Sequence, residues 1–436
     1  MPNRHRVVIL GGGFAGLNAA IKLKHAPVDI TLIDRRNFHL FQPLMYQVAT
    51  GSLSLGEIAA PLRGVLGRQK NAQVLLGEAA DIDPSAKRVI LRDGGTFDYD
   101  SLIVATGSQT SYYGNDSWRE WAPSLKSVEE ATTIRHKIFY AFERAERATT
   151  EEEARSWLTF VIVGAGATGM ELAGALAEIA NETLLHDFRR INPRSARILL
   201  VEGGPRVLPA YPEDLSAKGQ KLVEKLGVEV AKNVMVTNID AEGVTFKRGD
   251  TVEKLATRTV VWAGGITANE FGRKLAERAN AETDRSGRIK LNPDLTIPNH
   301  PEIFVPGDLG FSLNKEGKPL PGVAQVALQG GAYAARTIKA RLKGNTNLRP
   351  FHYFDKGDMA VIGRASAVAN IFGFHVSGLP AWLIWLFVHL MYIVEFQNRV
   401  MVFIKWGFEY ITFSRAARLI TGDTPTDVVG PAKPKK

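Results

Sequence analysis

The chain has 436 residues, a net charge of +9 and no cysteine. Without cysteine there is no disulfide scaffold, thiol nucleophile or cysteine-ligated iron–sulfur cluster, so any redox function needs an organic cofactor. The nine histidines are scattered and form no HExxH motif, which argues against a metal site. Lysine and arginine are spread along the chain rather than gathered in one stripe, which favours a membrane surface over nucleic acid as the partner.

The chain opens with the pattern of a strand, a glycine turn, a helix and a second strand. The apolar run 6–10 predicts a buried parallel strand, and Gly11-Gly12-Gly13-Phe14-Ala15-Gly16 follows it as GxGxxG. Asp34 ends the next strand, VDITLID, 18 residues after Gly16. Such glycines let the backbone approach a pyrophosphate, and such an acid can accept from ribose hydroxyls. The set predicts a dinucleotide site rather than an ordinary glycine-rich turn.

The same pattern starts again after a charged, helical stretch over 127–155. The strand WLTFVIV (157–163) leads into Gly164-Ala165-Gly166-Ala167-Thr168-Gly169, and Glu202 ends the following strand. The spacing from Gly169 to Glu202 is 33 residues, longer than usual, which predicts a helix extended through 182–190. A carboxylate at this place binds the 2′-hydroxyl of NAD and repels the 2′-phosphate of NADP, although Arg206 lies nearby in sequence.

Two shorter signals follow strands elsewhere, at Ala105-Thr106-Gly107 and at Gly307-Asp308. An aspartate at the second place can hold the ribityl–phosphate part of a flavin. Each signal taken singly is more typical of an ordinary turn.

The C-terminal region from Leu379 is apolar and aromatic. Residues 379–394 are too few to span a bilayer. In the next helix Asn398, Lys405, Glu409 and Thr412 form a narrow polar stripe on an otherwise mostly apolar surface. This pattern predicts a helix lying in the membrane interface; the alternative is a helical hairpin packed in the core or in a dimer interface. Residues 421–436 have the composition of a disordered tail.

Longer segments carry a more specific resemblance. The chain resembles the type II NADH:quinone oxidoreductases, which are two-dinucleotide-binding-domain flavoproteins, from about residue 6 to about residue 420. The segments that carry it are NFHLFQPLMYQVATGSLS (37–54), GAGATGMELAGALAEI (164–179), VVWAGGI (260–266), LPGVAQVALQGG (320–331), FDKGDMAVIG (354–363) and AWLIWLFVHLMYIVEFQNRV (381–400).

The resemblance implies an α/β fold with two Rossmann-like domains, an NAD domain inserted into an FAD domain, and a C-terminal amphipathic helical membrane anchor. The expected boundaries are 1–155 and 276–352 for the two parts of the FAD domain, 156–275 for the NAD(H) domain, 353–420 for membrane association and 421–436 for the tail.

The resemblance also implies the site residues. FAD is expected at Gly11, Gly13, Phe14, Ala15, Gly16, Asp34, Arg35, Ala79, Thr106, Gly107, Gly307, Asp308, Ala324, Gln325 and Lys356. NADH is expected at Gly164, Gly166, Thr168, Gly169, Glu202, Gly264 and Gly265, and no metal is expected.

Four residues are expected to act in catalysis, and each has a simpler interpretation. Gln325 and Gln329 resemble the family's AQxAxQ quinone motif and share a helix face, but could be ordinary exposed polar residues. Glu171 is the family's candidate for positioning nicotinamide or quinone and for relaying protons, or it only favours the helix dipole. Lys356 could stabilise a reduced flavin or be a surface lysine. Gly330 and Gly264 stand where relatives usually have glutamine and alanine, which leaves the fine quinone and nicotinamide contacts open.

The expected function is FAD-dependent oxidation of NADH with two-electron reduction of a membrane quinone, without proton pumping, at the cytoplasmic face of the membrane. Expected partners are a membrane quinone, the bilayer surface and a second copy of the chain in a homodimer, but no nucleic acid. The alternatives are a flavin reductase of the same fold with a soluble acceptor, and a non-catalytic protein that senses NADH.

Overall fold

The computed structural model describes residues 4–345 and 347–421, which fall into two compact units. Unit 1 contains residues 4–40, 59–109 and 266–355, with residue 346 outside the description, and unit 2 contains 41–58, 110–265 and 356–421. The two units therefore alternate along the chain, which passes between them at 40/41, 58/59, 109/110, 265/266 and 355/356. The expected tail lies outside the described residues from Gly422 onward.

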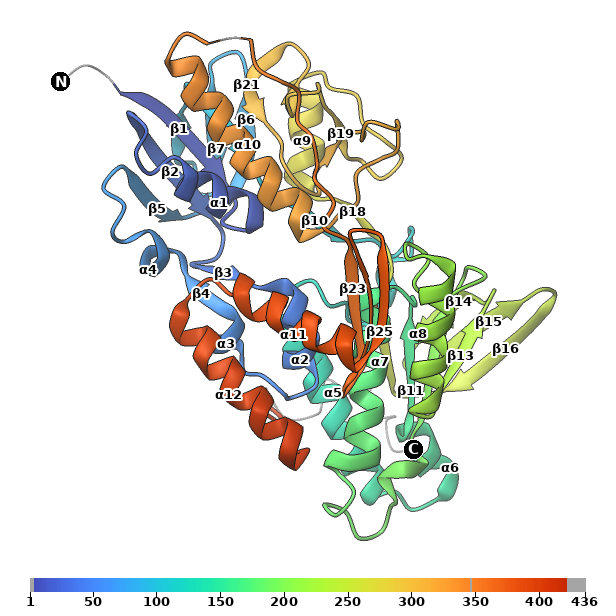
Figure 1. Ribbon diagram of the computed structural model, residues 1–436. Helices are drawn as coiled ribbons and strands as arrows, with labels where there is room; N and C mark the ends of the chain where they lie inside the picture. The colour runs from blue at the N-terminus through green and yellow to red at the C-terminus, as the bar shows by residue number, and fades with distance from the viewer. Residues whose placement is uncertain (1–3, 346, 422–436) are drawn as a thin grey trace. The chain divides into compact units, whose positions relative to one another are not determined.

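Unit 1 is built on a mostly parallel sheet (Figure 1). Its six strands lie in the order β20 (Thr296–Ile297), β21 (His300–Phe304), β9 (Ser101–Val104), β1 (His5–Leu10), β2 (Val28–Asp34) and β5 (Ala72–Leu76). Only β20 pairs antiparallel in this sheet, with β21. The central strands are continuous apolar runs because helices and loops cover both faces.

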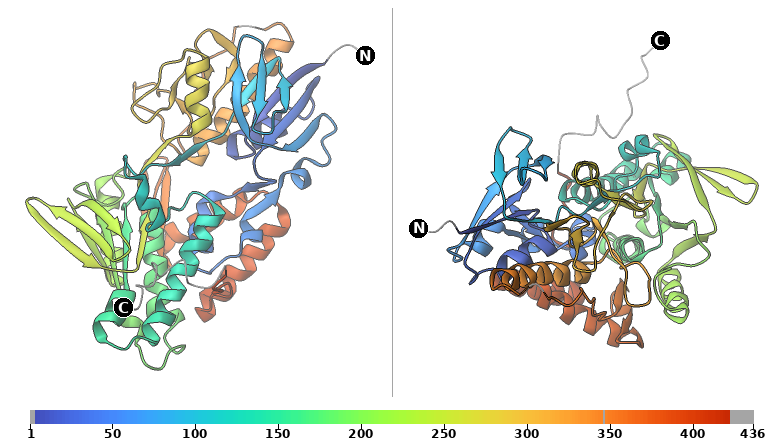
Figure 2. Two further views of the ribbon diagram at one scale, coloured as in Figure 1. Left: turned by 180° about the vertical axis from the view of Figure 1, so that it is seen from behind. Right: turned by 90° about the horizontal axis from the view of Figure 1, so that it is seen from above.

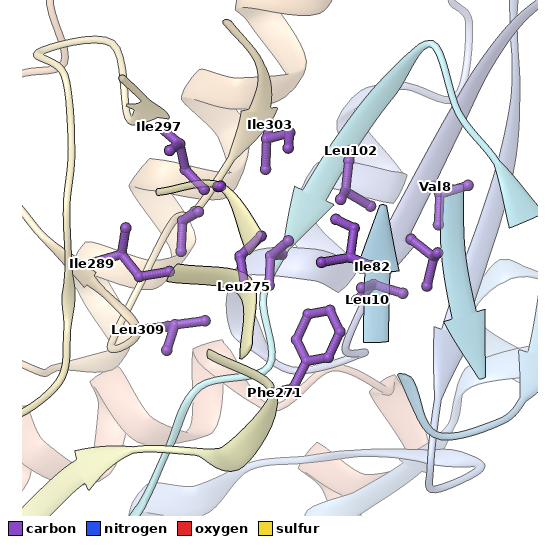
Figure 3. Packing of buried hydrophobic residues seen from close by; sticks show 14 of the residues in the cluster. Val8, Leu10, Ile82, Leu102, Phe271, Leu275, Ile289, Ile297, Ile303 and Leu309 are labelled. Carbon is purple, nitrogen blue, oxygen red and sulfur yellow. The ribbon is translucent and has the colours of Figure 1, made fainter. Parts of the chain in front are cut away.

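Two groups of elements cover the sheet of unit 1. Helices α1 (Phe14–Lys22) and α10 (Ala324–Leu342) pack against each other. A buried apolar cluster joins the sheet to α9 (Glu270–Arg278) and to the small antiparallel sheet β6–β7–β8, with Leu10, Ile82, Phe271 and Leu275 among its members (Figure 3). The remaining elements are β3 (Phe38–Leu40), β4 (Ala59–Pro61), α4 (Leu62–Leu66), β6 (Ala79–Asp83), β7 (Arg88–Leu91), β8 (Thr96–Asp98), β18 (Ile266–Ala268), β19 (Ile289–Lys290) and β22 (Gly310–Phe311).

Unit 2 repeats the arrangement on a smaller scale. Its four-stranded parallel sheet has the order β13 (Val228–Lys232), β12 (Arg197–Glu202), β11 (Thr159–Val163) and β17 (Thr259–Trp262). The charged stretch predicted as helical forms α5 (Val128–Glu146) and α6 (Glu151–Trp157). A capping box between Ser127 and Glu130 starts α5 and satisfies its free N–H groups.

Further elements complete unit 2. The meander of β14 (Met235–Asp240), β15 (Gly243–Arg248) and β16 (Thr251–Ala256) extends beyond the parallel sheet (Figure 2). The others are η1 (Gln42–Leu44), α2 (Met45–Ala49), α3 (Leu55–Ile58), η2 (Asp116–Glu120), α7 (Ala167–Glu178), a π-helical turn η3 (Ile179–Thr183), η4 (Pro193–Ser195), α8 (Glu213–Lys225), β23 (Asp358–Gly363), β24 (Ser366–Ile371), β25 (Phe374–Gly378), α11 (Leu379–Tyr392) and α12 (Phe396–Thr412). The short strand β10 (Ser108–Thr110) spans the division between the units.

Candidate active site

The glycine turn of unit 1 leaves a bare helix N-terminus at the end of β1. Gly11 has a φ of +99°, and a Cβ on Gly16 would lie 1.9 Å from the Gly11 carbonyl oxygen, so the turn and helix α1 meet more closely than a side chain allows. Gly13 precedes α1 with no side-chain cap, no acid occupies the first turn, and nothing lies within 4 Å of a Cβ built on Gly13. A helix N-terminus that has no side-chain cap and lies beside open space suits a pyrophosphate.

Asp34 closes this turn from the end of β2. Its carboxylate accepts from the backbone N–H of Gly12 at 2.5 Å and of Arg36 at 2.7 Å. Burial raises the pKa of Asp34, and these two hydrogen bonds oppose the rise. Of the neighbouring predicted residues, Phe14 packs edge-on to His39 with ring centroids 5.1 Å apart, Ala15 is buried, Arg35 is exposed, and Ala79 begins β6 half-buried.

The two shorter signals of unit 1 are tied together by residues that the sequence analysis did not single out. The Asn269 side-chain amide donates to the carbonyl oxygens of Thr106 (3.1 Å) and Gly107 (2.8 Å) while its oxygen caps α9. Ser108 donates to Asp308 at 2.9 Å. An asparagine before Glu-Phe-Gly signals a helix cap, but nothing local in the sequence reveals its partners 162 residues and more away.

Helix α10 carries the predicted quinone pair. Ala324 is its first residue, no side chain caps its N-terminus, and Gln325 and Gln329 follow one turn apart, both half-buried. The Gln329 amide binds both backbone groups of Phe354, donating to its oxygen and accepting from its nitrogen at 2.9 Å each. In this structure Gln329 therefore fixes the segment around Phe354.

The glycine turn of unit 2 has almost the same geometry. Gly164 has a φ of +102°, and a Cβ on Gly169 would lie 1.9 Å from the Gly164 carbonyl oxygen. Gly166 begins α7 without a side-chain cap and with open space around it, and Thr168 is exposed in the first turn. The Glu202 carboxylate accepts from the backbone N–H of Ala165 at 2.9 Å and of Gly204 at 2.8 Å.

Three further features define the surroundings of this turn. Ala263 donates to the Val163 carbonyl at 2.8 Å, which places the Gly264–Gly265 segment beside the turn. The Arg206 guanidinium donates to the carbonyls of Tyr211 and Pro209, so its hydrogen bonds go to the backbone. The helix predicted through 182–190 is wrong: α7 ends at Glu178, the π-helical turn ends at Thr183, and turns with one 3₁₀ segment account for the extra length.

Glu171, two residues after Gly169, lines a cavity of about 110 Å³ that lies wholly within unit 2. Burial raises the pKa of Glu171 to about 8, against a hydrogen bond from the Val361 backbone. Glu409 of α12 lines the same cavity, and burial raises its pKa to about 7 although it accepts from Ser52 and faces Arg415 and Lys405. Burial therefore moves the pKa of both carboxyl groups to near neutral pH.

Lys356 is exposed at the start of the C-terminal segment of unit 2. It donates to the Tyr392 hydroxyl at 2.9 Å and lies 5.6 Å from the centre of that ring. Its recorded partner is thus a residue of α11.

Helices α11 and α12 lie side by side and expose apolar side chains (Figure 1). Two residues of the expected polar stripe of α12 face the protein, because Lys405 pairs with Glu57 at 2.5 Å and Glu409 accepts from Ser52, whereas Thr412 is exposed. The side left outward is apolar, with Leu383, Phe387, Met391, Phe396, Phe403, Ile404, Phe408 and Ile411 all exposed. Within residues 4–345 and 347–421, no helix is both long and apolar enough to cross a membrane.

Two nucleotide-type turns at the carboxyl ends of parallel strands define a two-dinucleotide-domain oxidoreductase. Family comparison agrees: residues 5–331 match the family described as pyridine nucleotide-disulphide oxidoreductase, and residues 356–415 match the NDH2 C-terminal domain.

Named relatives narrow the class. The chain is 47% identical to the type II NADH:quinone oxidoreductase Ndh of Mycobacterium tuberculosis, covering 96% of this chain and 91% of that one. It is 30% identical to the enzyme of that name from Staphylococcus haemolyticus, covering 87% and 92%. A solved structure of NDH2 from Plasmodium falciparum shares the fold, with a TM-score of 0.87 at 21% identity over 94% of this chain and 99% of that one. The chain belongs to the type II NADH:quinone oxidoreductases, and the predicted family and fold class are confirmed.

Proposed function

We propose that this protein oxidises NADH and reduces a membrane quinone by two electrons, with FAD as cofactor and without proton pumping. This proposal rests on two glycine turns of the dinucleotide-binding type in a chain that is 47% identical to a named NADH:quinone oxidoreductase. Bound FAD supplies the electron relay between nicotinamide and quinone. The chain itself positions the reactants and controls protons.

The turn of unit 1 is assigned to FAD and the turn of unit 2 to NADH. In unit 1 the N–H groups at the start of α1 hold pyrophosphate, Asp34 accepts from ribose, and Asp308 contacts the ribityl–phosphate part. The other residues assigned to FAD are Gly11, Phe14, Ala15, Gly16, Arg35, Ala79, Thr106, Gly107, Gly307, Ala324, Gln325 and Lys356.

In unit 2 the start of α7 holds the NADH pyrophosphate. Glu202 accepts from the ribose 2′-hydroxyl, and a 2′-phosphate at that place would meet a carboxylate. The Arg206 guanidinium donates to two backbone carbonyls, so we do not assign it to a 2′-phosphate. The repulsion between Glu202 and a 2′-phosphate is therefore not offset by Arg206. NADH is therefore the preferred donor. Gly264 and Gly265 border the nicotinamide side.

Gln325, Gln329 and Glu171 are assigned to the quinone reaction, in which two protons must reach the product. Glu171 suits proton delivery because its pKa of about 8 keeps the carboxyl protonated at neutral pH. Gln325 is assigned as a donor to a quinone carbonyl. Gln329 uses one amide N–H and its oxygen to bind Phe354, so its second N–H is assigned the same role.

The outward face of α11 and α12 is assigned to the cytoplasmic side of the cell membrane. Exposed aromatic and aliphatic side chains on two adjacent helices, with the charged residues Lys405 and Glu409 turned inward, suit insertion into the upper part of one leaflet. Changing Phe403, Phe408 and Ile411 to glutamate should release the protein from lipid vesicles while leaving reduction of a small soluble dye. If the triple variant still sediments with vesicles, the assignment is wrong; a change of size in detergent instead would favour a homodimer through this face.

Anaerobic stopped-flow absorbance tests the reaction. NADH should bleach the flavin band of the purified holoenzyme, and menadione or a short-chain ubiquinone should restore it. Bleaching without return would favour a reductase with a soluble acceptor. Stoichiometric NADH binding without consumption would favour a sensor.

A further inference from the structure

Gly12, the second residue of the glycine turn of unit 1, is held at both of its backbone groups. Its N–H donates to the Asp34 carboxylate at 2.5 Å, and its carbonyl oxygen bonds Nδ1 of His39 at 2.9 Å. A carbonyl oxygen can only accept, so Nδ1 of His39 must carry the hydrogen. Burial lowers the pKa of His39, against the hydrogen bond to Gly12 and the charge of Asp34. The imidazole is therefore a neutral donor to the turn at neutral pH.

The position of the His39 imidazole is fixed by its surroundings in unit 1. His39 is the middle residue of β3 and pairs with Ala60 of β4, and its side chain is buried. Its ring lies edge-on to Phe14, the first residue of α1, with the ring centroids 5.1 Å apart. On Gly12 itself, a Cβ would lie 2.5 Å from a methyl carbon of Leu62, so the turn packs closely against α4. The donor and its acceptor are thus held in place by packing.

The bond from His39 also determines where the next N–H points. The peptide between Gly12 and Gly13 is trans, so the Gly12 carbonyl and the Gly13 N–H point in opposite directions. Because His39 holds the carbonyl, the Gly13 N–H is turned away from the imidazole. Gly13 precedes α1, where no side chain caps the helix and nothing lies within 4 Å of an added Cβ. This helix N-terminus is the place assigned above to the FAD pyrophosphate.

The turn of unit 2 holds the equivalent residue in the same way but with a different donor. The Ala165 N–H donates to Glu202 at 2.9 Å, and the Ala165 carbonyl accepts from the backbone N–H of Leu208 at 2.7 Å. Leu208 is buried with a φ of +47°, a backbone conformation that is unfavourable for leucine. Two turns of different sequence therefore both fix this carbonyl, one with a side chain and the other with the main chain.

We propose that His39 is a positioning residue for the cofactor: by donating to the Gly12 carbonyl, it directs the Gly13 N–H to the FAD pyrophosphate. The imidazole acts through the turn, and its effect is to orient a donor before FAD binds, so that binding does not have to order it. Loss of this bond should therefore weaken FAD binding more than it weakens the fold. The inference rests on the proposed assignment of FAD to unit 1.

The test is the release of FAD from the purified holoenzyme, followed as the rise of flavin fluorescence after dilution. His39→Asn and His39→Leu have nearly the same shape, but only the asparagine amide can donate from the place of Nδ1. His39→Leu should release FAD about tenfold faster than the parent protein, the effect of one lost hydrogen bond. His39→Asn should restore the bond and stay within about threefold of the parent rate.

Two further variants separate positioning from a general loss of packing. Gln69→Met is the matched control, because Gln69 is also buried in unit 1 and donates to the Ala20 carbonyl of α1 at 2.9 Å. It should lower the Tm and release FAD at the parent rate. His39→Gln moves the amide nitrogen to the place of Nε2 and should behave as His39→Leu does. It replaces His39→Leu in the comparison if that variant does not fold.

Three results would overturn the inference: release at the parent rate in His39→Leu, equally fast release in His39→Asn and His39→Leu, or fast release in Gln69→Met. Gly16→Ala distinguishes such a failure from a wrong assignment of FAD. If Gly16→Ala keeps its flavin, FAD does not bind at this turn, and the assignment fails together with the inference. If Gly16→Ala loses its flavin while His39→Leu keeps it, the assignment stands and only the role of His39 is rejected.

Discussion

The two glycine turns agree in φ and in how closely their glycines pack, but the helices that follow them make different contacts. Gly11 and Gly164 have φ values of +99° and +102°, and in both turns a Cβ on the last glycine would lie 1.9 Å from the carbonyl oxygen of the first. Two residues beyond the last glycine, α1 carries Asn18, which donates to the Leu328 carbonyl at 2.6 Å and ties α1 to α10. At the equivalent place α7 carries Glu171, which lines a cavity. The equivalent position thus joins two helices in unit 1 and lines a cavity in unit 2.

The acids that close the two turns also differ. Asp34 is short and accepts from the turn at Gly12 and from its own strand end at Arg36. Glu202 is one methylene longer and accepts at Ala165 and Gly204. In both, two backbone N–H groups orient the carboxylate, so the acid is held in place before any nucleotide binds.

The largest effects should come from adding a methyl group at the last glycine of each turn, in two separate variants. A methyl group at Gly16 or Gly169 would overlap a carbonyl oxygen at 1.9 Å, so the turn must open. Gly16→Ala should lower the flavin retained after gel filtration by about tenfold or more. Gly169→Ala should keep its flavin but bind NADH about tenfold more weakly or worse, measured by flavin bleaching. Equal flavin loss in both variants, with circular dichroism unchanged, would contradict the separate assignments.

The next largest effect should come from changing Glu171 of α7, which stands where α1 has Asn18. Glu171→Gln should slow quinone reduction by about 10²-fold or more, because this half-reaction needs a proton from the carboxyl. Flavin reduction by NADH needs no such proton and should be unchanged. In the parent protein the rate should fall as pH rises through about 8, where Glu171 loses its proton. Asn18→Ala is the control: it should cost about 1 kcal/mol of stability and neither half-reaction. A pH-independent rate would remove Glu171 from the reaction.

A smaller effect should follow from Glu202→Gln. An amide no longer repels a 2′-phosphate, so the ratio of kcat/KM for NADPH over NADH should rise about tenfold. The matched change Asp34→Asn should affect flavin retention and not this ratio. If the ratio is unchanged in Glu202→Gln, the ribose is read by other residues.

Local patterns in the sequence predict the turns because their requirements are local: a buried strand, glycines at fixed spacing and an acid ending the next strand. They do not predict Asn269 between Thr106 and Gly107, or Trp406 on Gln47, because these pairs are 162 and 359 residues apart. The sequence pattern of α12 does not predict which way Lys405 and Glu409 face, because their partners Glu57 and Ser52 lie in another segment. The extended helix was wrong because spacing alone does not distinguish a helix from turns.

The smallest effect concerns stability and compares Glu171 with Glu409 of the same cavity. Each carboxyl is costly to ionise when buried, so its pKa is higher in the folded than in the unfolded protein. As pH rises above 4.5, the ordinary glutamate pKa, the unfolded chain loses the proton first and the folded state is destabilised. This loss continues up to a pH of about 8 for Glu171 and about 7 for Glu409. Glu171→Gln should therefore raise the Tm little near pH 4.5 and by about 2 °C or more at pH 8. Glu409→Gln should gain less, because the amide gives up the charge-assisted hydrogen bond from Ser52 and the attraction of the nearby Arg415 charge. Scanning calorimetry at several pH values decides: Tm differences that are constant across pH would mean that neither carboxyl is held protonated by burial.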